Sequence, residues 1–263
     1  MATQTPKVEL RDIDLRYFTL EGETEALREF SLSVSPGEFV AIVGQSGCGK
    51  STLLSLVAGI LEPTDGDVLV NGAPVEGPSP LCGYMLQQDH LFEWRSILDN
   101  VVLGAEIQGL NRGDAIERAK TLLRGYGLGE FMDHFPHQLS GGMRQRAALA
   151  RTLCTDPEIL LLDEPFSALD FQTRLALSDE VSEILRREGK TVILVTHDIS
   201  EAVSMADKVI VMTKRPGRVK AVHDIVFKET ENGRPRPFEA RSLEEFRNYF
   251  DQIWSELDIH VGN

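Results

Sequence analysis

Residues 39–57 read FVAIVGQSGCGKSTLLSLV, and this stretch decides the fold. Its first five residues form an unbroken apolar run, which is typical of a strand buried on both faces of a parallel sheet. Gly44 to Ser51 then match the pattern G-x-x-x-x-G-K-[ST], and the leucines from Leu53 onward have the spacing of an amphipathic helix. A glycine-rich loop between a buried strand and a helix can surround a phosphate with main-chain N–H groups. We therefore predict a phosphate-binding loop at this point of a parallel sheet.

The polar groups of this loop each suggest a role in holding a nucleotide. We expect Lys50 to bridge the β- and γ-phosphates and the Ser51 hydroxyl to be a ligand of Mg²⁺. The predicted nucleotide-binding set covers the loop and the next residue: Gly44, Gln45, Ser46, Gly47, Cys48, Gly49, Lys50, Ser51 and Thr52. A chance glycine-rich turn is the alternative, and the strand and helix on either side weigh against it.

Cys48 lies inside the loop, and two interpretations of its thiol are open. Main-chain N–H groups, the helix dipole and Lys50 would stabilise a thiolate, which predicts a lowered pKa and rapid alkylation that bound nucleotide prevents. The alternative is a small, inward-packed side chain without special reactivity.

Short apolar runs recur later in the chain and predict further parallel strands at 159–162, 192–195 and 209–212. Helical patterns lie between these runs. An alternation of buried strands and helices predicts an α/β fold with a parallel sheet.

Two regions depart from this alternating pattern. Residues 8–18 nearly alternate between apolar and polar, with a slip at Arg11, as an exposed antiparallel strand does, and 68–70 read as a short strand between tight turns. Residues 95–135 are richer in helical patterning and glycine breaks. The expected architecture is a phosphate-loop NTPase core with a parallel sheet, an N-terminal antiparallel β part and an inserted α-helical subdomain.

Composition narrows the class of protein. The 263 residues are 42% apolar, which is enough for a packed core, and 27 Lys and Arg against 41 Asp and Glu leave a net charge of -14. This acidic balance disfavours nucleic acid or anionic lipid as a partner. The three cysteines suit neither a disulfide framework nor a metal cluster, so we expect a reducing compartment.

The distribution of apolar residues points to the cytoplasm. The N-terminal stretch does not have the pattern of a secretory signal, and the longest apolar runs are far shorter than the ~18 residues that suggest a bilayer span. If the protein drives transport, other chains must supply the pore. Five histidines have no metal-ligand spacing and receive no catalytic role: His90, His134, His137, His223 and His260.

A second acidic site follows the apolar run at 159–162. Asp163 and Glu164 come directly after that strand, which would place Asp163 near Mg²⁺ and Glu164 near an attacking water. Glu164 could be a general base or could only orient the water. Paired acids that merely cap a turn are the alternative, and the phosphate loop upstream makes it weak.

Residues 139–146, LSGGMRQR, predict a second phosphate site. Ser140 can cap a helix that begins with Gly141 and Gly142, so N–H groups remain open to an anion. Because one nucleotide already has its β-phosphate at Lys50, we expect the Ser140 site to meet the γ-phosphate of a nucleotide held by another copy. We therefore expect two chains to enclose ATP between them.

With these motifs the sequence resembles the ATP-binding-cassette (ABC) family over nearly its whole length. Tyr17 is similar to the aromatic residue that stacks on adenine, His197 to the histidine that reaches the γ-phosphate, and residues 167–170 to the dimer-contact loop. Gln87 matches the glutamine that contacts Mg²⁺ and senses the permease. Its neighbour Gln88 is the alternative, and Gln87 is preferred because family members usually have an acidic or polar residue just after the functional glutamine.

The resemblance implies ATP and Mg²⁺ as cofactors and assigns residues to them. The catalytic set is Lys50, Gln87, Glu164 and His197, and the metal set is Ser51, Gln87 and Asp163. Beyond the loop, the nucleotide-binding set contains Tyr17, Gln87, Ser140, Gly141, Gly142, Asp163 and Asp170. In isolation Tyr17, His197 and Asp170 could be ordinary strand or turn residues; their positions relative to Lys50 and Glu164 favour the functional interpretation.

Softer similarities point to the nitrate, sulfonate and taurine importer branch. They lie in residues 87–101, 135–146 and the final segment, although Glu93 stands where members often have proline. This branch implies a homodimer of ATPase subunits, integral membrane permease subunits, an indirect solute-binding protein and a peripheral position on the inner face of the cell membrane. A non-transport ABC ATPase acting on nucleic acid or the ribosome is the alternative, which the acidic balance and the single cassette disfavour.

Two expectations concern the domain plan and the surfaces. Residues 1–230 are expected to form the ATP-binding domain, with a helical subdomain at about 95–155, and 231–263 a C-terminal helical extension. An amphipathic pattern at 243–257 predicts a helix that docks on its own domain. Residues 89–97 are expected to receive a permease helix, although core packing is equally plausible for Leu91 and Phe92.

Overall fold

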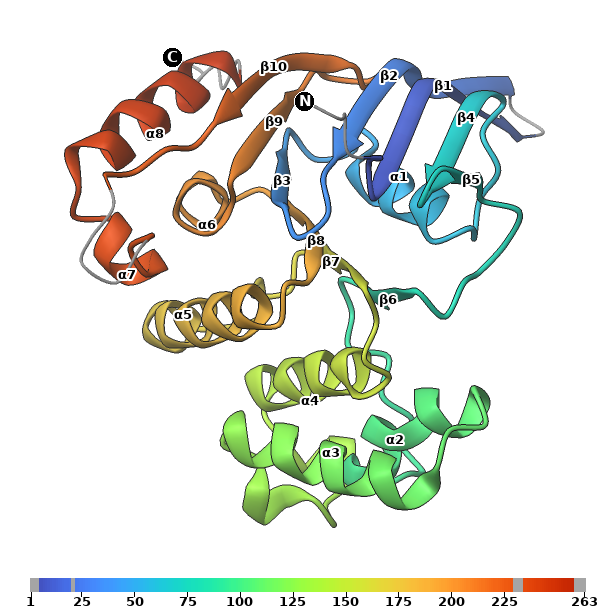
Figure 1. The fold of residues 1–263 in the computed structure, drawn as a ribbon, viewed down its shortest axis with the longest axis vertical. Helices are drawn as coiled ribbons and strands as arrows, with labels where there is room; N and C mark the ends of the chain where they lie inside the picture. The colour runs from blue at the N-terminus through green and yellow to red at the C-terminus, as the bar shows by residue number, and fades with distance from the viewer. Residues whose placement is uncertain (1–4, 20–21, 229–233, 258–263) are drawn as a thin grey trace.

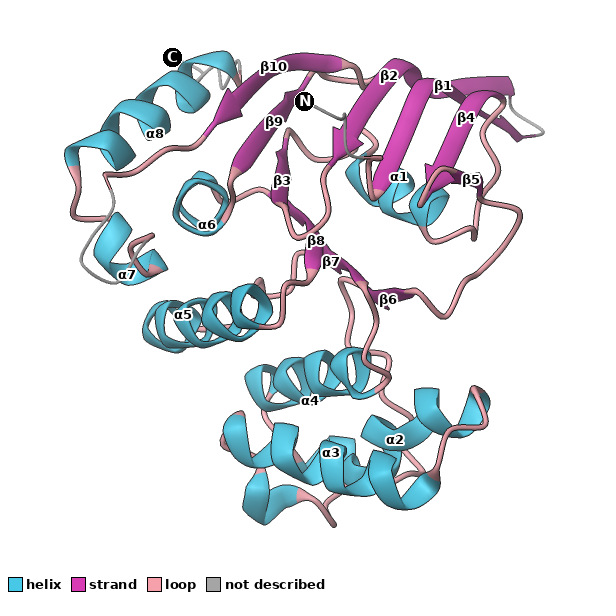
Figure 2. Ribbon diagram, viewed as in Figure 1, coloured by secondary structure: helices cyan, strands magenta, loops and turns pink. Residues whose placement is uncertain are grey.

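The computed structural model describes residues 5–19, 22–228 and 234–257, which form two sheets with helices around them (Figures 1 and 2). The larger sheet has the strand order β10-β9-β3-β8-β7-β6, and the smaller has the order β2-β1-β4-β5. The larger sheet contains β3 (Phe39–Val43), β6 (Cys82–Met85), β7 (Ile159–Asp163), β8 (Thr191–Thr196), β9 (Lys208–Met212) and β10 (Val219–Asp224). The smaller sheet contains β1 (Val8–Thr19), β2 (Gly22–Val34), β4 (Asp65–Val70) and β5 (Ala73–Pro74).

The central strands β3, β7 and β8 of the larger sheet are buried on both faces, which confirms the expected parallel core. β3 pairs in parallel with β8 and β9, β7 pairs in parallel with β8 and β6, and β10 is antiparallel to β9. Phe39, Ala41 and Val43 face a core shared with the helices, whereas Val40 and Ile42 face a core shared with the smaller sheet. Because both faces are covered, an unbroken apolar run is the sequence that such a strand requires.

The smaller sheet is antiparallel, as the alternation in residues 8–18 predicts. The slip at Arg11 is a real irregularity: the register of β1 shifts between Leu10 and Ile13, and Asp12 has a φ of 46°. β4 begins at Asp65, three residues earlier than predicted. Its first residues pair with polar positions of β1, where the apolar signal that marks a strand is missing.

Most helices lie beside the two sheets, and three of them form a separate group. Their bounds are α1 (Lys50–Val57), α2 (Ile97–Ile107), α3 (Arg112–Gly125), α4 (Gly141–Cys154), α5 (Phe171–Arg187), α6 (Ile199–Met205), α7 (Pro237–Ala240) and α8 (Glu244–Glu256), with 3₁₀ turns at η1 (Gly129–Phe131) and η2 (Pro136–Gln138). Helices α2, α3 and α4 lie together below the sheets, between β6 and β7 in the chain (Figure 1). No helix in the described ranges is long and apolar enough to span a bilayer.

The C-terminal helix α8 docks on its own domain, beside β10 and α6 (Figure 1). Phe246, Ile253 and Leu257 are buried in the core that the helices share. At the end of the helix, the Leu257 carbonyl accepts a hydrogen bond of 2.9 Å from Gln45 Nε2 in the phosphate loop. Residues 231–233 and 258–263 of the predicted extension, which include His260, lie outside the described residues.

Candidate functional site

The parallel strands bring several of the predicted site residues to one edge of the sheet. Val43 lies opposite Thr196 and Asp163 lies opposite Val195, so β3, β7 and β8 end at the same level. The residues that follow a parallel strand at its carboxyl end share one edge, which is where open α/β sheets bind ligands.

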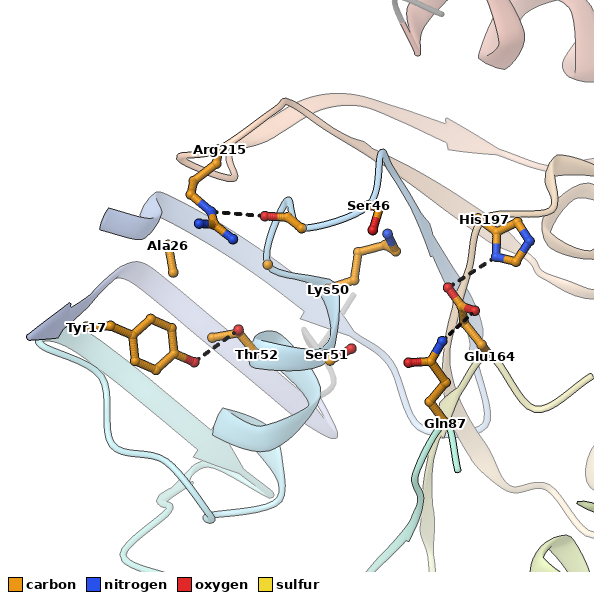
Figure 3. A pocket seen from close by; sticks show the side chains of 12 residues that line it. Tyr17, Ala26, Ser46, Lys50, Ser51, Thr52, Gln87, Glu164, His197 and Arg215 are labelled. Atoms are coloured by element: carbon orange, nitrogen blue, oxygen red, sulfur yellow. Dashed lines mark hydrogen bonds and ion pairs between the residues drawn. The ribbon is translucent and has the colours of Figure 1, made fainter. Parts of the chain in front are cut away.

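A cavity of about 470 Å³ opens at this edge (Figure 3). It is lined by Tyr17, Ala26, Ser46, Gly47, Gly49, Lys50, Ser51, Thr52, Gln87, Glu164, His197 and Arg215. Gln88 lines a separate hollow with Gly141 and Ala168, so the structure places Gln87, of the two neighbours, at the cavity. The lining comes from β1, β2, the phosphate loop with the start of α1, and the segments that follow β6, β7, β8 and β9. It has the polar character that a polyphosphate requires.

The phosphate loop has the shape that its glycines predict. Gly49 has a φ of 104°, and a Cβ atom there would lie 2.8 Å from Leu27 Cδ2, so only glycine fits. Lys50 is 7% exposed, and its Nζ donates to the carbonyls of Gly44 at 2.9 Å and Gln45 at 3.1 Å. The amine is thus held inside the curve of the loop, where its charge is directed at a bound phosphate.

Cys48 is not the reactive thiol that the sequence suggested. Its side chain is 1% exposed, and burial raises its pKa although Lys50 opposes this effect. The expected lowering of the pKa is wrong because the side chain points into the core beneath the loop, where desolvation outweighs the nearby positive charge. The second interpretation, a small inward-packed side chain, describes the structure.

We expect a short maleimide pulse at neutral pH to label Cys48 at least about tenfold more slowly in the folded chain than in urea, because a buried, protonated thiol is a poor nucleophile. Cys82 and Cys154 are controls, since burial also raises the pKa of Cys82, to about 11, and that of Cys154. Peptide mapping measures each site. Equally fast labelling of Cys48 in the folded chain and in urea would contradict its inward packing.

Glu164 lines one end of the cavity, and its carboxylate is held from two sides. Gln87 Nε2 donates to Glu164 Oε2 at 3.1 Å, and His197 Nδ1 lies 3.1 Å from Glu164 Oε1 (Figure 3). Its φ of 47° is unusual for a residue other than glycine, and such strain concentrates at functional sites. At the other end of the cavity the Tyr17 hydroxyl lies 3.2 Å from Thr52 Oγ1, which leaves the ring at the rim.

The donor set predicted for a cation is Ser51, Gln87 and Asp163. Ser51 and Gln87 line the cavity, and Asp163, which does not, is hydrogen-bonded to Ser51. Asp163 is 4% exposed; burial raises the pKa of its carboxyl, and a hydrogen bond from Ser51 opposes the rise. A hydroxyl, an amide and a carboxylate offer the oxygen ligands that Mg²⁺ prefers, with phosphate and water to complete the shell. Within the described ranges no group of three His, Cys, Asp or Glu side chains could hold a metal.

Ser140, Gly141, Gly142 and Asp170 lie outside the lining of the cavity. Ser140 caps α4 by accepting the Met143 N–H at 3.3 Å, and Asp170 caps α5 by accepting the Thr173 N–H at 3.0 Å. A Cβ atom on Gly142 would lie 2.8 Å from Leu169 Cδ2, so glycine lets the two loops touch. The segments that carry the two predicted nucleotide contacts, Ser140 and Asp170, therefore touch each other outside the lining of the cavity.

Two residues with a part in the site were missed. Gln145, which is 4% exposed, donates from Nε2 to the Glu164 carbonyl at 3.2 Å and accepts the Ala168 N–H at 3.1 Å. These two hydrogen bonds connect α4 to the turn after β7. Arg215 lines the cavity and donates from Nε to the Gly47 carbonyl at 3.1 Å. Both act on main-chain atoms of distant segments, and sequence spacing carries no signal for such contacts.

Residues 27–167 match the model of the family described as "ABC transporter". The chain is 45% identical over 242 residues to an uncharacterized ABC transporter ATP-binding protein, YtlC, of Bacillus subtilis (strain 168), with 92% of each chain covered. It is 44% identical over 215 residues to the taurine import ATP-binding protein TauB of Burkholderia thailandensis (strain ATCC 700388 / DSM 13276 / CCUG 48851 / CIP 106301 / E264), covering 82% of this chain and 83% of the relative.

A solved structure is similar to the whole core. It is the dimeric structure of a post-hydrolysis state of the ATP-binding cassette MJ0796 bound to ADP and Pi. The TM-score is 0.76 at 31% identity, covering 84% of this chain and 99% of the other. The fold around the cavity is thus similar to that of a protein solved with a hydrolysed nucleotide.

Proposed function

The chain belongs to the ABC transporter family as an ATP-binding subunit, and we propose that its ATP hydrolysis drives a solute importer whose membrane passage is built by separate permease subunits. The observation that carries the proposal is the cavity in which Lys50, Gln87, Glu164 and His197 meet at the carboxyl edge of the parallel sheet. Residues 1–230 form the ATP-binding domain in this proposal, with the helical subdomain at about 95–155, and 231–263 form the C-terminal extension.

In this proposal each residue around the cavity has a separate role in phosphoryl transfer. Lys50 and the main-chain N–H groups of the loop bind the β- and γ-phosphates, and the Tyr17 ring stacks on adenine. Ser51, Gln87 and Asp163 would hold Mg²⁺, which neutralises charge on the phosphate oxygens. Glu164 orients the attacking water or accepts its proton, while His197 contacts the γ-phosphate.

The working unit in this proposal is a homodimer with ATP at the interface. Ser140 and Asp170 lie outside the cavity of their own chain, on a surface where the N-terminus of α4 is open to an anion. A second copy placed face to face would bring this surface to the γ-phosphate. The dimeric, ADP- and Pi-bound structure of the similar cassette MJ0796 supports this arrangement.

The solute class follows from relatives and from sequence similarity. Three relatives at 41–44% identity are named taurine import ATP-binding proteins, and the same branch is indicated by residues 87–101 and 135–146. We assign the chain to import of a small nitrate-, sulfonate- or taurine-type solute. A solute-binding protein and the permease would select it, and the chain would lie on the inner face of the membrane through its contact with the permease.

The permease contact is assigned to the loop between β6 and α2. Phe92 and Trp94 are 37% and 74% exposed and stack with their ring centroids 4.8 Å apart, whereas Leu91 is buried in the core. Asn100, which is fully buried, accepts the Phe92 N–H at 2.7 Å and so fixes the loop beneath the aromatic pair. A rigid, exposed aromatic pair beside Gln87 is suited to receive a short helix.

Replacing Trp94 with alanine is expected to weaken binding to the permease about tenfold or more, because aromatic anchors contribute strongly to interfaces. Basal ATP hydrolysis should stay within about twofold, since Trp94 does not line the nucleotide cavity. Trp254→Ala is the matched control, because Trp254 is 46% exposed on α8. Co-purification from membranes measures binding; equal retention of the Trp94 and Trp254 variants would rule out this docking surface.

The function itself is tested with the assembled transporter. The chain is co-purified with permease subunits encoded beside it, reconstituted into vesicles, and assayed for ATP hydrolysis with and without the binding protein loaded with taurine, an alkanesulfonate or nitrate. We expect one of these solutes to stimulate hydrolysis and to enter the vesicles. ATP hydrolysis without any permease association would overturn the transport assignment.

A further inference from the structure

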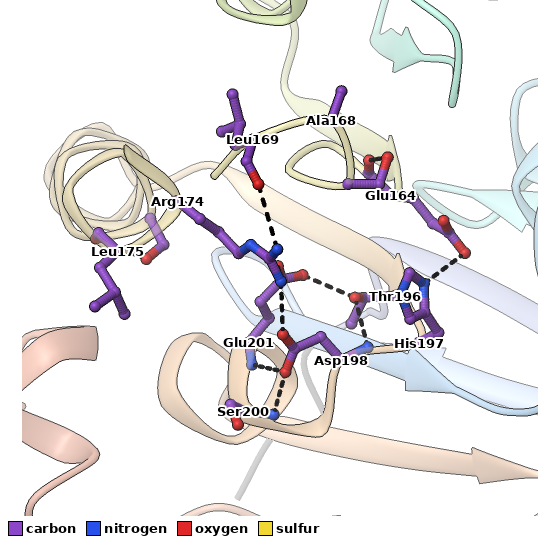
Figure 4. A network of polar contacts seen from close by, with 12 residues as sticks. Glu164, Ala168, Leu169, Arg174, Leu175, Thr196, His197, Asp198, Ser200 and Glu201 are labelled. Carbon is purple, nitrogen blue, oxygen red and sulfur yellow. Dashed lines mark hydrogen bonds and ion pairs between the residues drawn. The ribbon is translucent and has the colours of Figure 1, made fainter. Parts of the chain in front are cut away.

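A group of polar side chains lies behind the cavity and joins the two loops on either side of Glu164 (Figure 4). One loop is residues 167–170, the surface assigned to the second chain, and the other is the end of β8 with His197. Arg174, on α5, lies between these loops and points toward the N-terminus of α6 (Figure 4). Arg174 and the polar partners described below do not line the nucleotide cavity.

Arg174 binds both loops with the two ends of its guanidinium group. Its Nη2 donates to the Leu169 carbonyl at 3.3 Å, and its Nη1 donates to Asp198 Oδ2 at 3.0 Å. The same Nη1 lies 3.8 Å from Glu201 Oε1. A planar fork of donors can hold a carbonyl and a carboxylate at once in a fixed geometry, whereas a lysine ammonium offers its donors from one point on a flexible stem.

The residues on both sides of His197 are fixed by the same group. Thr196 Oγ1 donates to Glu201 Oε2 at 2.7 Å and accepts the Asp198 N–H at 3.0 Å. Asp198 Oδ1 also caps α6 by accepting the Ser200 N–H at 2.7 Å. The direction of the His197 side chain is thus set by Thr196 before it and Asp198 after it.

Burying the Glu201 carboxylate costs free energy of desolvation. Its side chain is 4% exposed, and burial raises its pKa to about 7 although the hydrogen bond from Thr196 opposes the rise. The charged and titratable groups around it are Arg174, Asp198, His197 and Arg241. A buried carboxyl is tolerated when its oxygens are hydrogen-bonded or paired with a charge. Here one partner is Thr196, at the end of the strand just before His197.

We propose that Arg174, with Asp198 and Glu201, is a positioning residue for hydrolysis that holds the dimer-contact loop and His197 at one relative position. The inference rests on the proposed ATP hydrolysis at a two-chain interface. When the second chain presses on residues 167–170, the Leu169 carbonyl moves Arg174, and Arg174 moves the turn that carries His197. Closure of the dimer thereby sets the distance between His197 and Glu164, which is 3.1 Å between Nδ1 and Oε1 in the single chain.

The test is the ATPase kinetics of full-length Arg174→Met, which keeps the length of the side chain and removes its donors. We expect kcat to fall between about tenfold and a hundredfold, because small misplacement of a group that contacts the reacting phosphate is costly. The KM for ATP should change less than about twofold, because the phosphate loop is not contacted. A loss of folding stability alone would lower the active fraction, and this would also lower the apparent kcat at an unchanged KM. Active sites are therefore titrated with tightly bound nucleotide, and kcat is expressed per active site.

Arg187→Met is the matched control, since Arg187 lies exposed on the same helix and the described residues give its side chain no hydrogen bond or ion pair. Arg174→Lys keeps the charge and is expected to recover only part of kcat. If the residues act as a unit, the losses in Arg174→Met and Glu201→Gln are not additive in the double variant, whereas those of Arg187→Met and Glu201→Gln are.

The outcomes separate this inference from the function on which it rests. If the wild-type chain hydrolyses no ATP under any condition, the proposed function fails. If the wild type is active and both Arg174→Met and Arg174→Lys retain kcat within about twofold, or if their KM rises while kcat is unchanged, Arg174 is not a positioning residue. Additive losses with Glu201→Gln would equally overturn the coupling.

Discussion

Replacing Glu164 with glutamine is expected to slow ATP hydrolysis roughly 100-fold or more while leaving ATP binding close to that of the wild-type chain. The amide has nearly the same shape as the carboxylate, so it still fills the space between Gln87 and His197. It lacks the negative charge that orients water and cannot accept the proton of that water. Lys50 and the phosphate loop, which provide the binding energy, are unchanged.

Hydrolysis is measured as phosphate release, and binding as retention of labelled ATP. The control is Glu158→Gln, at the start of the same apolar run, where the exposed Glu158 forms an ion pair with Lys7 far from the cavity. An exposed pair contributes little, so this variant should behave as the wild type. The Glu164 variant should also accumulate as an ATP-bound dimer in size-exclusion chromatography. Turnover near the wild-type rate would remove Glu164 from the reaction.

The parallel core could be predicted from the sequence because burial on both faces leaves a continuous signal. The run at residues 39–43 coincides with β3, and those at 159–162, 192–195 and 209–212 lie within β7, β8 and β9. β6 and β10 were not predicted. β6 contains Gly83 and a tyrosine, and β10 alternates between half-buried and exposed positions at the edge of the sheet, so neither gives an unbroken apolar run.

The site could be predicted as far as its residues follow strands directly. The phosphate loop, Glu164 and His197 each come within one or two positions of a strand end, and parallel pairing then places them at one cavity. The side on which Cys48 packs depends on the core beneath the loop. The contacts of Gln145, Arg174 and Arg215 depend on main-chain carbonyls of other segments. Such contacts exist only after the chain has folded, and no local sequence pattern predicts them.

The second large effect is expected in dimers built from two differently substituted chains. Ser140→Arg would block the N-terminus of α4, and Lys50→Ala removes the charge that binds the phosphates. If each site is made from Lys50 of one chain and Ser140 of the other, these substitutions damage the same site when they lie in different chains. They damage both sites when they lie in one chain.

We therefore expect one enclosed ATP per dimer when the substitutions lie in different chains and none when they lie in the same chain. Both chains carry Glu164→Gln so that bound ATP is not consumed, and the parental dimer, with two, sets the scale. Ser255→Arg, at an exposed position of α8, controls for the added side chain. The opposite pattern, with one ATP retained when both substitutions share a chain, would mean that Lys50 and Ser140 of a single chain close the same site. The arrangement would then require α4 to move toward α1 within the chain, because neither Ser140 nor its glycines line the cavity that contains Lys50.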